Sequence, residues 1–227
     1  MKAKIKISLF VVMVFSIIVG CKKDNLDAPS SLLTGNVVYD GQAIGVRSGT
    51  AVQLELWQRG YANFEKIRVM VAQDGSFSAR LFDGDYKLTM SAGGPWVFDT
   101  DSIDVQVRGN TIVDFPVTPY TIVESANYQR SGNNINATVN LQSVNTAQPL
   151  ESVRFYISKT ILVDNEQKDA VVTLNASDIA DVNLAQNLSL AIPASLANAE
   201  AVYVRVGVKV VGVGELAYSP VEKIQLN

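Results

Sequence analysis

The residue types that dominate enzyme active sites are almost missing from this chain of 227 residues. It has no histidine, and its one cysteine is Cys21. Serine and cysteine hydrolases need a histidine base beside the nucleophile, and zinc sites draw their ligands mainly from histidine and cysteine. We therefore predict a protein that is not an enzyme and that uses no cofactor and no zinc.

Carboxylates are the remaining groups that could do chemistry, and three of them are closely spaced at Asp99, Asp101 and Asp104. Two acids suffice in many glycosidases, and oxygen ligands suit Ca²⁺. A small sandwich seldom cradles a sugar ring deeply, however, and the glycine and spacing of an EF-hand loop are missing. The favoured interpretation is a solvated loop before a strand, with Asp99 and Asp101 kept as candidate sugar-binding groups.

Aromatic residues form a more informative group. Trp57 falls on the polar side of an alternating segment, and Tyr61 and Phe64 follow it across a short loop. Trp96 lies in a Gly-Gly-Pro-Trp segment outside any expected strand. Exposed rings on loops of a rigid scaffold suit carbohydrate, because the C–H face of a sugar stacks on an aromatic plane. Trp57, Tyr61 and Trp96 are therefore candidate glycan-binding residues.

Other roles for the two tryptophans remain open. Trp96 could fold back as a plug at the end of a sandwich, and Trp57 could pack on a second domain. Either ring could also belong to a protein interface, where aromatic residues are enriched.

The first twenty residues resemble a lipoprotein signal peptide. Three lysines precede an apolar run of 13 residues at 7–19, which is shorter than the roughly 20 residues of a membrane-spanning helix. The run ends in Ile18-Val19-Gly20-Cys21, which resembles the lipobox of exported lipoproteins. We expect cleavage before Cys21 and acylation of that residue, which would attach the protein to a membrane.

The charge of the processed chain argues against nucleic acid as a partner. Removing the three lysines of residues 1–20 leaves 16 basic residues against 22 acidic ones, a formal charge of −6. Nucleic-acid-binding proteins usually carry a basic patch instead. Residues 21–31 are polar and predict a flexible tether. Its Lys22-Lys23-Asp24 segment resembles the charged residues that follow the acylated cysteine in surface lipoproteins of the Bacteroidota.

From Leu33 onward the hydrophobic pattern has a period of two, which predicts strands and no convincing helix. Asp-Gly pairs at residues 40–41, 74–75 and 83–84 favour tight hairpins. About seven strands are expected before Pro119, which disfavours a continuing central strand. The alternating segments are 52–57, 67–71, 77–81, 86–90, 103–107 and 113–117.

The alternation starts again beyond Pro119. It is clearest at 202–210, where valines alternate with Tyr203, Arg205, Gly207 and Lys209. Single helical turns are expected within 177–181 and 193–198. The predicted fold class is all-β, with two consecutive β-sandwich domains after a cleaved lipoprotein signal peptide. The predicted divisions are 1–20 for the signal peptide, 21–31 for the tether, 32–119 for the first sandwich and 120–227 for the second.

Both halves resemble known domain families. Residues 33–40, 73–77 and 81–86 carry the G-x-V, D-G-x-F and G-x-Y elements of carboxypeptidase-regulatory-like, transthyretin-type sandwiches. At the C-terminal end, 203–206, the glycine-rich turn after it and Tyr218-Ser219-Pro220 resemble the last hairpin of a fibronectin type III or immunoglobulin-like domain.

The whole chain resembles a family of two-domain Bacteroidota outer-membrane lipoproteins of unknown function. That resemblance implies an outer-membrane, cell-surface location near polysaccharide-uptake systems. We therefore expect an accessory glycan-binding lipoprotein, whose partners are a polysaccharide or oligosaccharide and an outer-membrane transporter complex. The alternative is a structural or protein-interaction module that acts as a spacer or docking surface.

Overall fold

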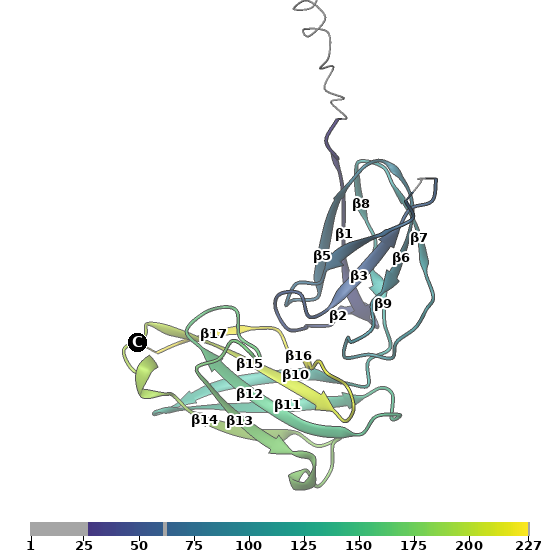
Figure 1. Ribbon diagram of the computed structural model, residues 1–227. Coiled ribbons are helices and arrows are strands. Elements are labelled where there is room, and N and C mark those ends of the chain that lie inside the picture. The colour runs from purple at the N-terminus through teal and green to yellow at the C-terminus, as the bar shows by residue number, and fades with distance from the viewer. Residues whose placement is uncertain (1–26, 61–62, 227) are drawn as a thin grey trace, which may run out of the picture.

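The alternating segments form strands in the computed structural model of the protein, which describes residues 27–60 and 63–226. The strands of these residues form four sheets, two in each of two consecutive domains (Figure 1). The predicted all-β fold with two sandwiches is confirmed. The described residues include no helix that is long and apolar enough to cross a membrane.

The first domain pairs a sheet built around β1 with the sheet β4-β3-β6-β7. Strand β1 pairs antiparallel with β2 and β5, and parallel with β8 and β9. The strands are β1 (Ser31–Tyr39), β2 (Gln42–Ala43), β3 (Gln53–Trp57), β4 (Lys66–Met70), β5 (Ser76–Leu81), β6 (Gly84–Met90), β7 (Ile103–Val107), β8 (Asn110–Ile112) and β9 (Phe115–Pro116).

Alternation along these strands sends one set of side chains between the two sheets. Leu54 and Leu56 of β3 and Leu88 of β6 are fully buried, while their neighbours in sequence are not. Burial of a side chain of this size stabilises the fold by about 1.5–3 kcal/mol. The opposite face of the sheet β4-β3-β6-β7 is therefore left for polar and aromatic residues.

The Asp-Gly pair at residues 40–41 forms the predicted tight turn, whereas the pair at residues 83–84 has a different backbone conformation. Asp40 and Gly41 both have positive φ, 49° and 75°, as a tight turn between β1 and β2 requires. Gly84 instead begins β6 without a positive φ. Glycine is needed at this position because a larger residue would clash: a Cβ there would lie 2.2 Å from Nε2 of Gln58.

The second domain has an immunoglobulin-like arrangement. One sheet has the order β10-β11-β14, and the other has the order β13-β12-β15, with β16 and β17 both paired to β15. The predicted helical turns are present as η1 (Ala176–Asp178) and η2 (Ala194–Leu196). The strands are β10 (Thr121–Ser131), β11 (Asn134–Ser143), β12 (Leu150–Ser158), β13 (Ala170–Asn175), β14 (Gln186–Ala191), β15 (Ala201–Val210), β16 (Ala217–Tyr218) and β17 (Glu222–Gln225).

Ile67 and Arg205 are two of the positions that depart from the simple alternation. Ile67, expected to face inward, is 40% exposed because β4 is an edge strand of its sheet. Arg205, expected on the polar side of β15, is fully buried. The first domain packs on Arg205, and Tyr218 and Leu216 of the second domain cover Gly207, so both faces of the strand are buried from Val204 to Val208.

Arg205 connects the two domains through backbone carbonyl groups. Its guanidinium donates hydrogen bonds to the carbonyl oxygens of Val46 (2.9 Å), Gln73 (2.5 Å) and Ser219 (2.7 Å). The first two acceptors belong to the first domain and the third to the second. Burial lowers the pKa of Arg205 to about 10, so the group remains protonated at neutral pH.

Further polar contacts surround this arginine. The amide of Tyr218 donates to the carbonyl of Gly45 at 2.9 Å, which extends the strand pairing across the domain boundary. Arg47 forms a bidentate ion pair with Glu215 at 2.8 and 2.9 Å. The contacts join the β2–β3 segment to β16 and its neighbours, and they hold the sandwiches in the arrangement of Figure 1.

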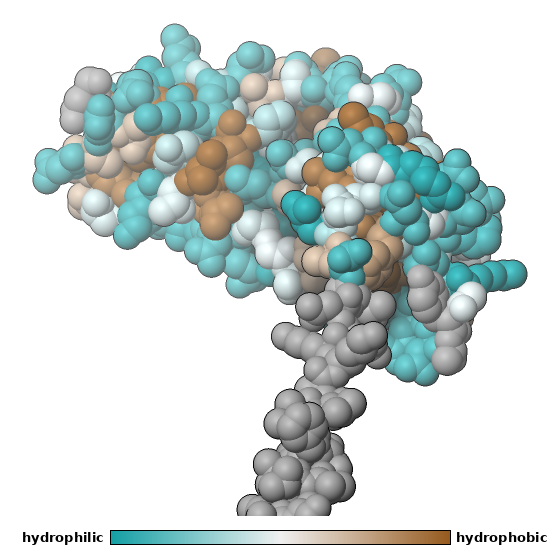
Figure 2. Space-filling model, turned by 90° about the horizontal axis from the view of Figure 1, so that it is seen from above, coloured by the Kyte–Doolittle hydropathy of each residue, from teal (hydrophilic) through white to brown (hydrophobic). Residues whose placement is uncertain are grey.

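The surface shows no large continuous apolar area in the view of Figure 2, where hydrophobic residues form separate patches among hydrophilic ones. Such patches are ordinary on a folded protein and do not by themselves mark a site. A functional site must therefore be found from the way particular side chains are combined.

Candidate functional site

A groove of about 630 Å³ lies on the outer face of β3, β6 and β7 in the first domain. This volume is typical of small-molecule sites. Strand register aligns three of its side chains, since Trp57 lies opposite Lys87 and Lys87 lies opposite Asp104. All three point away from the core because they alternate with buried residues.

Two aromatic rings supply the apolar part of the groove. Trp57 ends β3 and is half-buried, whereas Phe64 lies just before β4 and is 55% exposed. Their ring centroids are 5.2 Å apart, with the planes tilted by 35°. Contact between the rings fixes their relative position at an exposed edge. Tyr86 also borders the groove; it is 3% exposed, and its hydroxyl donates to the carbonyl of Phe82 at 3.0 Å.

Polar groups surround the rings. Lys87 donates to Asp104 at 2.5 Å, and Asp85 accepts a hydrogen bond from Gln106 at 3.1 Å. The rest of the lining consists of uncharged polar groups and one arginine: Gln58, Arg59, Thr89, Thr100 and Ser102. An apolar wall with several hydrogen-bonding groups is suited to a polar ligand that also has an apolar face.

Glu55 supports the groove from the neighbouring position on β3. Its carboxylate accepts hydrogen bonds from Lys66 at 2.5 Å and from Ser91 at 2.8 Å. Burial acts to raise the pKa of this carboxyl, but these hydrogen bonds outweigh it and hold the pKa below its ordinary value. Glu55 is therefore ionised at neutral pH, as a fixed partner for Lys66.

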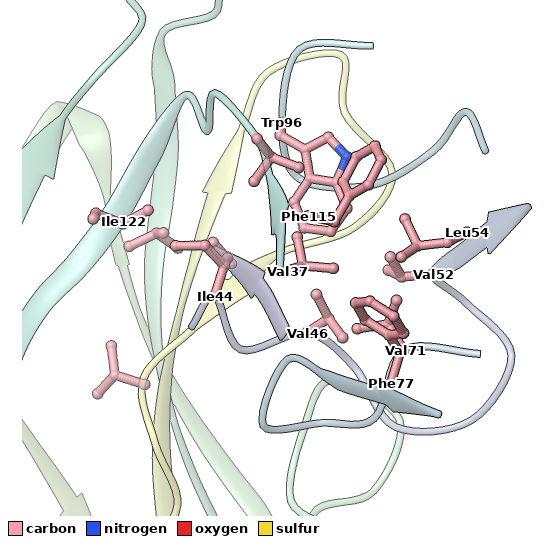
Figure 3. Packing of buried hydrophobic residues seen from close by; sticks show 14 of the residues in the cluster. Val37, Ile44, Val46, Val52, Leu54, Val71, Phe77, Trp96, Phe115 and Ile122 are labelled. Carbon is pink, nitrogen blue, oxygen red and sulfur yellow. The ribbon is translucent and has the colours of Figure 1, made fainter. Parts of the chain in front are cut away.

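Trp96 does not belong to this groove, which corrects its prediction as an exposed ring. It is only 3% exposed and points into the core beside Phe115 and Val37 (Figure 3). Its backbone pairs with Pro119, which holds the 94–97 segment against the domain junction. No face of its indole ring is open to a sugar, so Trp96 is a structural residue that closes the end of the sandwich.

The predicted acids also lie outside the lining. Asp99 and Asp101 are exposed, and the carboxylate of Asp99 accepts the amide of Asp101 at 2.9 Å within their own loop. Their neighbours Thr100 and Ser102 line the groove instead. Tyr61 and Cys21, the other predicted site residues, lie outside the described residues.

Most of the charged and aromatic groups of the groove are already arranged in contacts with neighbouring side chains. Its two lining carboxylates, Asp85 and Asp104, are each engaged by a neighbouring side chain. Among the described residues, no group of three His, Cys, Asp or Glu side chains could hold a metal ion. The aromatic and polar side chains that line the groove offer ring stacking and hydrogen bonds to a ligand.

Trp57 and Phe64 were predicted from the sequence to lie near each other. Lys87, Asp85 and Arg59 were not predicted to be part of the same site. Alternation does assign Asp85 and Lys87 to the outer face of their strand. What it lacks is the register between β3 and β6, which pairs Trp57 with Lys87 across 30 residues of sequence.

Comparisons with known proteins agree with this architecture. The family described as "Protein of unknown function (DUF3823) N-terminal domain" matches residues 31–118, and "Domain of unknown function (DUF3823_C)" matches 120–223. No curated protein matches the chain.

Two solved structures with a similar fold are DUF3823 family proteins. A DUF3823 family protein of Bacteroides ovatus is 39% identical, with a TM-score of 0.82 over 87% of this chain and 100% of its own. A second, from Parabacteroides merdae, is 37% identical, with a TM-score of 0.80 over 88% and 100%.

A more distant structure, from Bacteroides uniformis, has a name that proposes carbohydrate binding. It is 19% identical, with a TM-score of 0.72 over 87% of this chain and 100% of its own, which shows a common fold. With both domain matches and two relatives above 30% identity, the chain belongs to the DUF3823 family, a two-domain family of unknown function.

Proposed function

We propose that this protein binds carbohydrate without cleaving it, through the groove on β3, β6 and β7. The observation that carries the proposal is the Trp57–Phe64 ring pair, open at one edge of a groove rich in hydroxyl, amide and charged groups. A sugar combines an apolar C–H face with a rim of hydroxyls, and the groove offers a partner for each.

The distant structural neighbour supports this choice. That Bacteroides uniformis protein shares the two-sandwich fold, and its name proposes carbohydrate binding. At 19% identity it does not transfer a ligand to this chain. It favours carbohydrate over other polar ligands, and substitutions in the groove provide the test.

The test uses residues 22–227, which contain every described strand, in gels cast with single polysaccharides. Retardation by at least one polysaccharide is expected, because bound protein migrates more slowly. Trp57→Ala and Phe64→Ala are expected to remove the retardation. Phe82→Ala is the matched control, since Phe82 is 47% exposed but does not line the groove. A broad panel that retards neither the unmodified protein nor the control would overturn the proposal.

We further propose that the protein is lipid-anchored at Cys21 in the outer membrane, at the cell surface, beside a polysaccharide-uptake complex. Supporting this, β1 begins at Ser31, ten residues after Cys21. An extended segment of that length spans at most about 35 Å. Ser31 contacts Asp83 and Gly109, close to the start of β6, so the groove lies toward the tethered end of the first domain.

Metabolic labelling with a fatty-acid probe tests the proposed anchor. The unmodified protein is expected to incorporate the probe and to fractionate with outer membranes. Cys21→Ser is expected to abolish labelling. Equal labelling of the two proteins would contradict acylation at this position.

A protein-docking function is the second candidate, and the edge strand β4 favours it. Ile67 and Met70 are each 40% exposed there, and Phe64, just before the strand, is 55% exposed. Methionine and aromatic residues are enriched in protein interfaces. Cross-linking in cells and isolation of a stoichiometric partner, lost in Ile67→Ser and Met70→Ser but retained in Trp57→Ala, would favour docking over glycan binding.

A further inference from the structure

We infer that the groove selects glycans that carry negative charge, such as polymers of uronic acids, and that Arg59 is the residue that recognises the anion. The inference rests on the proposed carbohydrate-binding function and narrows it to one class of ligand.

Most charged side chains at the groove are already neutralised by a neighbour. Lys87 pairs with Asp104 at 2.5 Å, and Asp85 pairs with Arg108 at 3.4 Å. These pairs leave no net charge from four side chains. Arg59, by contrast, forms no hydrogen bond or ion pair with any other residue in the described parts of the chain. Among the charged side chains that line the groove, Arg59 is therefore the one that an incoming ligand meets unmatched within the described residues.

The position of Arg59 suits recognition of a sugar substituent. It lies two residues after Trp57, at the end of β3, and lines the same groove while remaining exposed. A ring stacked on Trp57 would place its substituents among the side chains of this rim. A guanidinium offers two parallel N–H groups, which match the two oxygens of a carboxylate.

The net charge of the protein makes this a local effect. Residues 22–227 contain 16 basic and 22 acidic residues, a formal charge of −6, so long-range attraction does not favour a polyanion. Preference for an acidic glycan must then arise from contact with Arg59 and fall as salt screens that contact. This separates the inference from general adhesion of polyanions to a basic surface.

The experiment compares two polymers that share a backbone and differ in charge. Residues 22–227 are titrated with polygalacturonic acid and with its fully methyl-esterified form, by calorimetry at low and high salt. The acid form is expected to bind about two- to fivefold more tightly at low salt, the range that one exposed ion pair provides. Arg59→Gln is expected to reduce this ratio to about one. Arg80→Gln, an arginine on β5 outside the groove, is the charge-matched control and should retain the ratio.

The outcomes separate this inference from the function on which it rests. Binding of the neutral ester with the same affinity as the acid, lost in Trp57→Ala, would overturn the charge selection and leave the carbohydrate-binding function intact. A preference for the acid that persists in Arg59→Gln would assign recognition to another cation and overturn the role of Arg59. Failure of neutral and acidic polysaccharides alike, across the broad gel panel, would overturn both proposals.

Discussion

The guanidinium of Arg205 lies over the ring of Tyr218, with its central carbon 4.4 Å from the ring centroid. Both residues belong to the second domain, yet both reach carbonyl groups of the first. The fully buried cation thus sits between an aromatic face and backbone acceptors, an arrangement in which a cation–π contact and charge-assisted hydrogen bonds act together.

Replacement of Arg205 by Met is expected to lower the free energy of unfolding by about 3 kcal/mol or more, because it leaves the buried carbonyls of Val46, Gln73 and Ser219 without a donor. Arg205→Lys should also destabilise, since one ammonium cannot reproduce the planar fork. Urea unfolding measures both effects. Arg80→Met is the control, and a loss below about 1 kcal/mol for Arg205→Met would contradict the assigned role.

Acidification is expected to weaken the domain contact through Asp164. This carboxylate is buried and accepts hydrogen bonds from Ser48 at 2.7 Å across the boundary and from the amides of Glu166 and Gln167. Burial acts to raise its pKa, but the hydrogen bonds outweigh that effect and the pKa is lowered. Because the folded pKa is depressed, the stabilisation is complete above the unfolded value, about 3.9, and is lost as pH falls through the folded value.

Unfolding of Asp164→Asn between pH 7 and pH 2 measures this contribution. The variant should be less stable than the unmodified protein at pH 7, and the difference should shrink below about pH 4. A difference that stays constant over the whole range would show that ionisation of Asp164 does not stabilise the fold.

The two tryptophans are expected to behave differently. Trp96→Ala should cost about 3–5 kcal/mol because it empties a packed site in the core. Trp57→Ala should cost about 1 kcal/mol or less. Fluorescence separates the rings, since the chain has only these two tryptophans. Emission from Trp96 in Trp57→Phe should be blue-shifted and resist acrylamide, whereas Trp57 in Trp96→Phe should be quenched. Equal quenching would contradict the burial difference.

Close approach of the domains is expected to make Gly45 intolerant of a side chain. A Cβ at this position would lie 2.6 Å from the carbonyl oxygen of Tyr218 and 2.6 Å from Arg205 Nη2. Gly45→Ala should therefore destabilise by about 1–3 kcal/mol, as overpacking does. Gly214→Ala is the matched control, because a Cβ at that position would meet nothing within 4 Å and its φ is not in the left-handed region. Equal melting temperatures for both variants would contradict a tight boundary.

Alternation of residue types was sufficient to predict most strands, because each sandwich buries one face of each sheet. It could not predict Arg205, since its position alternates with valines and therefore indicates a solvated face. Packing of the first domain on β15, together with the ring of Tyr218, buries that side chain. The groups that stabilise the buried charge of Arg205 are backbone carbonyls, which every residue has, so the residue types give no sign of them.

The candidate groove was predictable in part for a similar reason. Trp57 carried a local signal, an aromatic residue on the polar face of a strand. Trp96 carried a comparable signal, but its loop folds back to pair with Pro119 and buries the ring. Whether an aromatic residue in a glycine-rich segment faces solvent depends on that non-local pairing, which sequence spacing does not contain.

The buried Arg205 restricts movement of the two sandwiches relative to each other. Since a single planar group holds carbonyls of both sandwiches, neither sandwich can turn without breaking hydrogen bonds to it. A macromolecule bound to the second domain would therefore fix the direction in which the Trp57–Phe64 edge of the first domain points. If the groove binds a polymer, the orientation of that polymer would then depend on a contact in the other domain.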